Sequence, residues 1–167
     1  MTRLLVVDDV PLFRAGLTSA LTAAGFEVVG EAGSAESAVA KAEEEQPDLV
    51  LLDVLMPGLS GLDVVEKITA ASPHSSVVLL TGSESEEDML TALKAGARGY
   101  IVKDMPFPVL VDSIVAVADG GAALSPQMAG KLFDVCRQLL RHQELLQSRK
   151  PTLTGREIEV IQLVARG

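Results

Sequence analysis

The stretch Asp48–Gly58 constrains the fold more than any other part of this sequence, because four aliphatic residues lead directly into a carboxylate. A short unbroken aliphatic run that ends at turn residues is typical of a parallel strand buried on both faces. Pro57 and Gly58 then turn the chain away. We therefore expect Asp53 at the carboxyl end of a central strand, where ligands bind in open α/β sheets. An aspartate there could equally cap the next turn, so the other strands decide its role.

Aliphatic runs alternate with helical patterns throughout the first 120 residues. Helices are expected from Pro11 to before Gly25, from Ser34 to before Pro47, and over 62–71, 84–95 and 106–118. Strands are expected over 3–7, 26–32, 48–52, 76–80 and 99–102. This alternation predicts an α/β fold, a flavodoxin-like doubly wound five-stranded parallel sheet with strand order 2-1-3-4-5, followed by a C-terminal helical extension.

Polar residues follow four of the five predicted strands. Asp8 and Asp9 follow the first strand, Asp53 the third, Thr81 the fourth and Lys103 the fifth. Right-handed crossovers bring all strand ends to one edge, and these four strands are neighbours about 4.8 Å apart. The sequence thus predicts that three carboxylates, one hydroxyl and one ammonium group converge, whereas separate capping roles would require four coincidences.

Three clustered carboxylates repel one another and need a cation to remain ionised together. A site of oxygen ligands without His or Cys favours Mg²⁺, or Mn²⁺ as a similar ion. Asp8, Asp9 and Asp53 are the expected carboxylate ligands, and the backbone carbonyl of Leu55 is the expected fourth protein ligand. The cluster therefore predicts a metal site that a phosphoryl group completes.

A carboxylate can also act as a nucleophile toward phosphorus and form an aspartyl phosphate. Lys103 would offset the charge of the transferring group, and Thr81 would donate a hydrogen bond to it. The same edge of the sheet is therefore suited to phosphorylation of Asp53.

These residues resemble the receiver domain of two-component response regulators over residues 3–120. The resemblance rests on Asp8-Asp9, Asp53, Met56-Pro57-Gly58, Gly61, Thr81, Tyr100 and Lys103. It implies a regulator, rather than a turnover enzyme, whose Asp53 accepts a phosphoryl group from a sensor histidine kinase. It also implies that Asp8 and Asp9 hold Mg²⁺ and that Lys103 contacts the phosphoryl group.

The resemblance further implies a switch, in which Thr81 moves toward the phosphoryl group and Tyr100 turns between outward and inward rotamers. One departure concerns the residue after Lys103, which is Asp104 where many receivers have a proline after a cis bond. A cis bond here would cost about 3 kcal/mol, so the isomer of this bond stays open.

Charge and composition divide the chain into two parts. Residues 1–120 contain 7 Lys or Arg and 19 Asp or Glu, whereas residues 121–167 contain 7 and 4. The acidic part should repel nucleic acid, so only the tail could face DNA. No apolar run approaches the roughly 20 residues of a membrane helix, and the single Cys136 fits a reducing compartment. We expect a cytoplasmic protein without a membrane partner.

A long helical pattern begins at Ser125-Pro126, within a predicted linker over residues 122–150. Its apolar stripe has heptad-like spacing and consists of Met128, Leu132, Val135, Leu139, His142 and Leu146. Two interpretations stay open. Either the helix packs against its own domain, which is predicted to comprise residues 1–121, or it forms the seam of a homodimer.

Residues 151–167 resemble the first helix of a LuxR-type helix-turn-helix domain, because they contain Leu153-Thr154-Gly155-Arg156-Glu157. Thr154 and Glu157 also form a capping-box pattern. The helices that would enter the major groove do not follow. We expect a DNA-binding output domain that is truncated in this sequence. This chain should therefore bind DNA weakly or not at all.

Other classes of protein share part of this pattern. An aspartate-nucleophile phosphatase of the haloacid dehalogenase type would need Asp-x-Asp on the first strand, where this chain has adjacent aspartates. A flavin or nucleotide domain would need a phosphate-binding loop after that strand, but residues 8–11 are anionic. A phosphate-independent receiver scaffold stays open, although such scaffolds usually lack one of the site residues.

Overall fold

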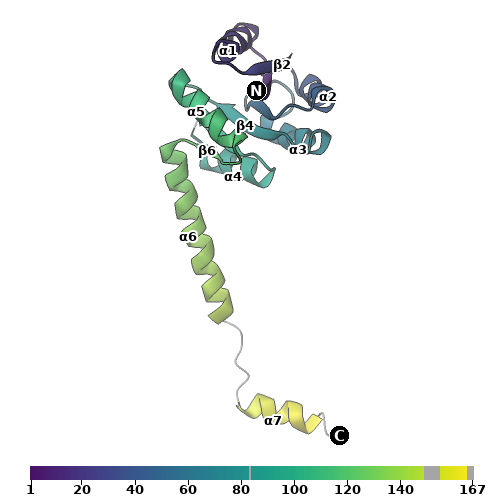
Figure 1. The fold of residues 1–167 in the computed structure, drawn as a ribbon. Coiled ribbons are helices and arrows are strands. Elements are labelled where there is room, and N and C mark those ends of the chain that lie inside the picture. The colour runs from purple at the N-terminus through teal and green to yellow at the C-terminus, as the bar shows by residue number, and fades with distance from the viewer. Residues whose placement is uncertain (83, 149–154, 165–167) are drawn as a thin grey trace. The chain divides into compact units, whose positions relative to one another are not determined.

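A computed structural model of the protein describes residues 1–82, 84–148 and 155–164 (Figure 1). It contains a parallel six-stranded sheet in the order β2-β1-β3-β4-β5-β6. The strands are β1 Arg3–Val7, β2 Glu27–Ala32, β3 Leu49–Asp53, β4 Ser76–Thr81, β5 Gly99–Val102 and β6 Ala123–Leu124. The predicted flavodoxin-like fold and the order of its first five strands are confirmed.

The sequence predicted five strands, but the structure has a sixth, β6, which pairs with β5 at the edge of the sheet. This strand contains only Ala123 and Leu124. Two residues are too few to show the alternation or the aliphatic run by which a strand is recognised in a sequence. Ala123 is nevertheless buried, so the added strand extends the core beneath the last helix of the sheet domain.

Five helices cover the two faces of the sheet. They are α1 Pro11–Ala23, α2 Ala35–Glu45, α3 Gly61–Ala71, α4 Glu86–Lys94 and α5 Phe107–Ala118. Helices α1 and α5 supply side chains to one core cluster with alternate residues of the strands. Helix α3 contacts both α2 and α4 on the other face. This two-sided cover explains why Leu49–Leu52 of β3 are fully buried although adjacent residues point to opposite faces.

Serine side chains determine where three of these helices begin. Ser34 forms a capping box with Ser37, Ser60 accepts from the backbone amide of Leu62, and Ser85 accepts from that of Asp88. A cap at Ser85 moves the start of α4 from the predicted Glu84 to Glu86. All peptide bonds in the described part of the chain are trans, which decides the isomer of Lys103–Asp104.

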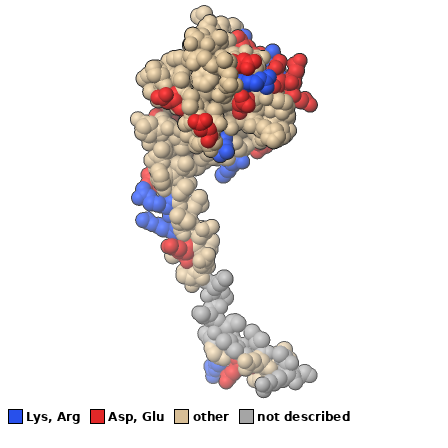
Figure 2. Space-filling view, in the orientation of Figure 1, with Lys and Arg blue, Asp and Glu red and all other residues tan. Residues whose placement is uncertain are grey.

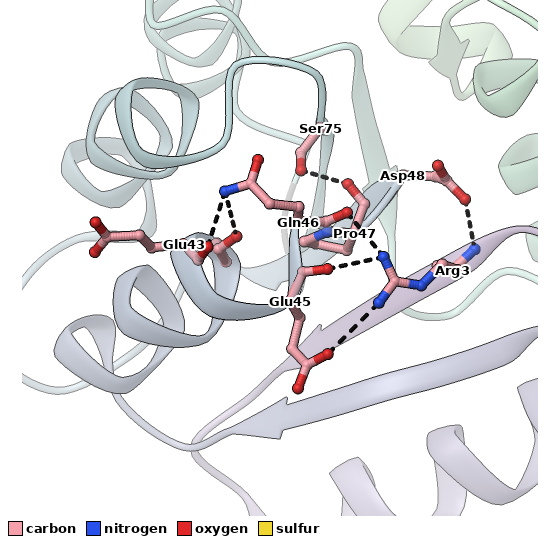
Figure 3. A network of polar contacts seen from close by, with 8 residues as sticks. Arg3, Glu43, Glu45, Gln46, Pro47, Asp48 and Ser75 are labelled. Carbon is pink, nitrogen blue, oxygen red and sulfur yellow. Dashed lines mark hydrogen bonds and ion pairs between the residues drawn. The ribbon is translucent and has the colours of Figure 1, made fainter.

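A polar network joins the elements at the amino end of β3 (Figure 3). The Arg3 guanidinium donates to the backbone carbonyls of Glu45 and Gln46 at the end of α2, and it lies 3.5 Å from the Glu45 carboxylate. The Gln46 amide donates to the carbonyls of Ala42 and Glu43 and to that of Ala71 in α3. Buried Ser75 donates to the Pro47 carbonyl. The network therefore fastens α2 and α3 to the sheet.

The chain divides into two compact units, Met1–Gly130 and Lys131–Gly167. Helix α6 (Pro126–Ser148) begins in the first unit, where Met128 is buried and its amide donates to the Ser125 hydroxyl. Helix α7 (Gly155–Val164) belongs to the second unit. The predicted end of the linker at residue 150 and the predicted cap at Thr154 lie outside the described residues. None of the described helices combines the length and the apolar character needed to cross a bilayer.

Candidate functional site

The polar residues predicted at the strand ends meet at the carboxyl edge of the sheet. Asp8 and Asp9 follow β1, Asp53 ends β3, Thr81 ends β4 and Lys103 follows β5. Parallel pairing of β3 with β1 and β4, and of β4 with β5, makes these strand ends neighbours. Asp8, Asp53 and Thr81 are almost completely buried, which is unusual for polar side chains.

The three carboxylates form one cluster. One oxygen of each of Asp8, Asp9 and Asp53 lies within 4.8 Å of the others. Asp8 Oδ1 accepts from the backbone amide of Val10 at 2.8 Å, and Asp53 Oδ1 accepts from that of Leu55 at 3.0 Å. These bonds orient two of the carboxylates before any ligand arrives. The oxygen-only donor set and its concentrated negative charge fit a hard divalent cation such as Mg²⁺.

Lys103 is the cation that the chain itself supplies to this cluster. Its Nζ atom lies 2.8 Å from Asp8 Oδ2 and 3.2 Å from Asp53 Oδ2. It also lies 4.5 Å from the centre of the Phe13 ring. The sequence did not indicate a role for Phe13 at the site, although an aromatic residue in the first turn of the helix after Asp8-Asp9 was a visible signal. The Lys103 ammonium group therefore makes a cation–π contact with the Phe13 ring.

The protonation equilibria at the site reflect this crowding. Burial raises the pKa of Asp53, although the Leu55 amide and the charge of Lys103 oppose the shift. Burial lowers the pKa of Lys103, but the hydrogen bond to Asp8 and the charge of Asp53 outweigh burial, and the pKa ends above its ordinary value. Lys103 therefore keeps its charge. Burial disfavours the ionised form of Asp53, and an added cation would reduce this free-energy cost.

Thr81 and Tyr100 lie next to each other on β4 and β5. Their side chains are hydrogen-bonded, both residues are buried, and burial raises the pKa of the Tyr100 hydroxyl. The Tyr100 ring therefore points inward in this structure. A change in the position of Thr81 would act directly on the Tyr100 hydroxyl.

Gly61 allows the loop after Asp53 to fold closely over β3. A Cβ atom at this position would lie 2.6 Å from the Asp53 carbonyl oxygen and 2.7 Å from Val54 Cα, which is closer than real atoms approach. The Gly61 amide donates to the Val54 carbonyl at 3.1 Å. The first residue of α3 must therefore be glycine if the loop is to hold Asp53 and Leu55 in this arrangement.

Residues 4–115 match the response regulator receiver domain family. The chain belongs to this family. It is 35% identical over 165 residues to the nitrate/nitrite response regulator protein NarL of Escherichia coli strain K12, covering 98% of this chain and 75% of NarL. It is 36% identical over 166 residues to the response regulator GacA of Pseudomonas aeruginosa, covering 99% of this chain and 76% of GacA.

Solved structures agree with this assignment. A two-component response regulator of the LuxR family from Aurantimonas sp. SI85-9A1 superimposes with a TM-score of 0.76 at 30% identity, covering 80% of this chain and 96% of that one. The signal receiver domain of the putative response regulator NarL from Mycobacterium tuberculosis gives a TM-score of 0.68 at 33% identity, covering 71% and 97%. This receiver is therefore related to LuxR-family response regulators.

Proposed function

We propose that this receiver accepts a phosphoryl group on Asp53 from a phosphohistidine of a sensor histidine kinase, in a reaction that requires Mg²⁺. The observation that carries the proposal is the position of Asp53, which shares Lys103 with Asp8 inside a cluster of three carboxylates. A cluster that only stabilised the fold would have no reason to concentrate so much like charge in a buried place.

In the proposed transfer, a carboxylate oxygen of Asp53 attacks phosphorus, the new O–P bond forms, and the histidine N–P bond breaks. Lys103 lies 3.2 Å from Asp53 Oδ2 and offsets the charge that the phosphoryl group brings. Asp8, Asp9, Asp53 and the backbone carbonyl of Leu55 would hold Mg²⁺ or Mn²⁺. When bound, the metal supplies positive charge against the phosphoryl oxygens. The protein assists its own modification and is not a turnover enzyme.

Thr81 and Tyr100 would transmit the modification to the rest of the receiver. The Thr81 hydroxyl would leave its hydrogen bond with Tyr100 to donate to the phosphoryl group, and the Tyr100 ring would then change its rotamer population. The direct contact between the two buried side chains supports this proposal. Phosphorylation would thus bias a two-state element rather than rebuild the fold.

The output is proposed to be transcription regulation through a LuxR-type DNA-binding domain that begins at residue 151. In this view residues 1–121 form the receiver, residues 122–150 are the linker, and α7 belongs to the first helix of the output domain. The proposal is supported by similarity to the response regulator GacA over 99% of this chain and to a LuxR-family response regulator over 80% of it. We place the protein in the cytoplasm, with a sensor kinase and a second copy of itself as partners.

The test is to incubate the protein with acetyl phosphate and Mg²⁺ and to measure its intact mass. We expect one added phosphoryl group on the wild type and on Asp48→Asn, which changes an aspartate at the other end of β3. No adduct is expected on Asp53→Asn or when Mg²⁺ is left out. An equal adduct on Asp53→Asn would exclude Asp53 as the acceptor, and labelling without Mg²⁺ would exclude the metal site.

A further inference from the structure

We infer that Arg14 of α1 is a positioning residue for the metal site, because it holds the peptide group between the two neighbouring aspartates Asp8 and Asp9. The inference rests on the proposed Mg²⁺ site and adds to it a residue outside the cluster of carboxylates. The hydrogen bonds of the Arg14 guanidinium go to a backbone carbonyl and to Glu31. Arg14 would therefore act on the metal through the position of Asp9.

The guanidinium of Arg14 bridges two strands at the carboxyl edge of the sheet. Its Nη1 atom donates to the backbone carbonyl of Asp8 at 2.6 Å, and its Nε atom donates to Glu31 Oε2 of β2 at 3.1 Å. The Arg14 side chain is only 20% exposed, so water competes little for these charge-assisted bonds. Arg14 thereby ties α1 to both strands at the point where β1 ends.

The carbonyl of Asp8 is one of four polar groups that fix this residue. Its amide donates to the Ala32 carbonyl at 3.1 Å, its Oδ1 atom accepts from the Val10 amide, and its Oδ2 atom accepts from Lys103. With Arg14 on the carbonyl, every polar group of Asp8 has a partner. Asp8 is thus held on all sides, and the bond to its carbonyl also fixes the plane of the peptide group that follows.

Asp9 is held differently from the other two carboxylates of the cluster. Asp8 and Asp53 each accept from a backbone amide and lie beside Lys103. Among the described residues, no hydrogen bond or ion pair holds the Asp9 carboxylate. A peptide group is planar and turns as one unit, so the bond from Arg14 to the Asp8 carbonyl sets the direction in which the chain enters Asp9. Loss of this bond would loosen the carboxylate that depends most on the backbone.

The loop after β2 leaves room for the guanidinium. A Cβ atom at Gly33 would lie 3.2 Å from Arg14 Nη1, which is closer than most real contacts of such an atom. Glycine therefore lets the guanidinium lie against the backbone of this loop, while Glu31 holds its Nε atom. The guanidinium is fitted into its position by three segments of the chain.

Electrostatic attraction and positioning predict opposite effects of Arg14 on the metal. Residues 1–120 contain 7 Lys or Arg and 19 Asp or Glu, and in the view of Figure 2 acidic side chains are spread over more of the sheet domain than basic ones. A positive charge near the cluster repels Mg²⁺, so charge alone predicts tighter metal binding without Arg14. Positioning predicts weaker binding, because oriented ligands bind a metal more tightly. The sign of the change separates the two effects.

Arg3 provides the matched control at the amino end of the sheet. Like Arg14, it donates to a backbone carbonyl and pairs with a glutamate, in this case Glu45 (Figure 3). Both arginine side chains are partly buried. Arg3→Met and Arg14→Met therefore remove the same group and the same kinds of contact, but only Arg14→Met removes a contact of the metal site.

The experiment is calorimetric titration of the whole 167-residue chain with MgCl₂, without phosphorylation and at constant ionic strength. We expect Arg14→Met to raise the dissociation constant for Mg²⁺ about tenfold, as is typical when a group that orients a metal ligand is lost. Arg3→Met should leave the constant within about twofold. Arg14→Lys keeps the charge but not the planar fork, so it should raise the constant about threefold. Urea unfolding shows which variants fold, and Arg14→Lys decides the matter if Arg14→Met does not.

An unchanged or lower dissociation constant in the deciding variant of Arg14 would overturn the inference, and so would an equal rise in Arg3→Met. A wild type that does not bind Mg²⁺ would overturn it together with the metal site. Both results are read from binding alone and do not require phosphorylation.

Labelling with acetyl phosphate separates this inference from the proposed function. The Mg²⁺ concentration for half-maximal labelling should rise in Arg14→Met by the same factor as the dissociation constant, with the maximal rate within about twofold of wild type. A lower maximal rate at an unchanged Mg²⁺ requirement would contradict the positioning role. If no variant is labelled but the difference in Mg²⁺ binding persists, phosphorylation of Asp53 is excluded and the role of Arg14 stands.

Discussion

Strand β3 has an aspartate just before it and another at its end, and the two differ in almost every property except residue type. Asp48 is exposed, and its Oδ2 atom accepts from the backbone amide of Arg3 at 2.8 Å. Asp53 is only 3% exposed and shares Lys103 with a second buried carboxylate. One aspartate joins two strands, whereas the other belongs to a cluster with an excess of negative charge.

The surroundings of the two residues extend this difference. At the amino end, Arg3 and Gln46 donate mainly to backbone carbonyls, so the network of Figure 3 satisfies groups that the helix ends leave open. At the carboxyl end, three carboxylates meet one ammonium group. Polar residues at the amino edge thus stabilise the fold, and those at the carboxyl edge are arranged for a ligand that carries positive charge.

The largest expected effect is the response to metal. Mg²⁺ at 100 times its dissociation constant should stabilise the wild type by about 2.7 kcal/mol, because it binds the folded state only. Asp9→Asn should lose most of this gain, since it removes one carboxylate from the cluster, and Asp48→Asn should keep it. Thermal unfolding with and without Mg²⁺ measures the gain. An equal gain in both variants would contradict the division between the two ends of β3.

The second effect concerns the counter-charge. Lys103→Met should slow labelling by acetyl phosphate about tenfold to a hundredfold, because one charge-stabilising group near the transferring phosphoryl group contributes roughly 1.4 to 2.7 kcal/mol. Lys67→Met, an exposed lysine of α3, is the control and should label at the wild-type rate. Intact mass against time gives both rates, and equal slowing would mean that general charge, not the contact with Asp53, matters.

How much of this was predictable depends on whether local sequence decides the feature. The five longer strands and the common edge of Asp8, Asp53 and Lys103 were predictable, because buried parallel strands are continuous aliphatic runs and their polar ends are visible. The inward position of Tyr100 was not predictable, since a single sequence gives no rotamer. The roles of the site residues in phosphotransfer stay predictions.

The features that sequence did not reveal are contacts between distant elements. The Arg3 guanidinium meets Glu45 across 42 residues of sequence, and the Lys103 ammonium meets the Phe13 ring across 90. Neither pair has a spacing that a periodic pattern could indicate. Met128 has the heptad position of an exposed seam residue, but the burial of the first turn of α6 removes it from that surface. Tertiary packing, rather than local propensity, decides each case.

A smaller effect tests the amino end. Ser75→Ala should lower the free energy of unfolding by about 1 to 3 kcal/mol, because the buried Ser75 hydroxyl donates to the Pro47 carbonyl and pairs with Ser72. Ser113→Ala removes a half-buried hydroxyl of α5 that donates only to the Val109 carbonyl of its own helix, and it should change stability little. Urea unfolding measures both. If Ser75→Ala also slowed labelling as strongly as Lys103→Met, the two ends of β3 would not be independent.

The smallest effect tests how far the carboxyl-end cluster extends. The Phe13 ring contacts the Lys103 ammonium at 4.5 Å, and such a contact contributes about 0.5 to 1 kcal/mol at a partly exposed position. Phe13→Leu should therefore slow labelling about two- to fivefold, and Phe13→Tyr, which keeps the ring, should restore the rate. Leu12→Ala, at the 85% exposed neighbouring residue, is the control. Phe and Tyr both offer Lys103 a π face, and Leu does not. If Phe13→Tyr slowed labelling as much as Phe13→Leu, the Phe13 ring would therefore act through packing alone.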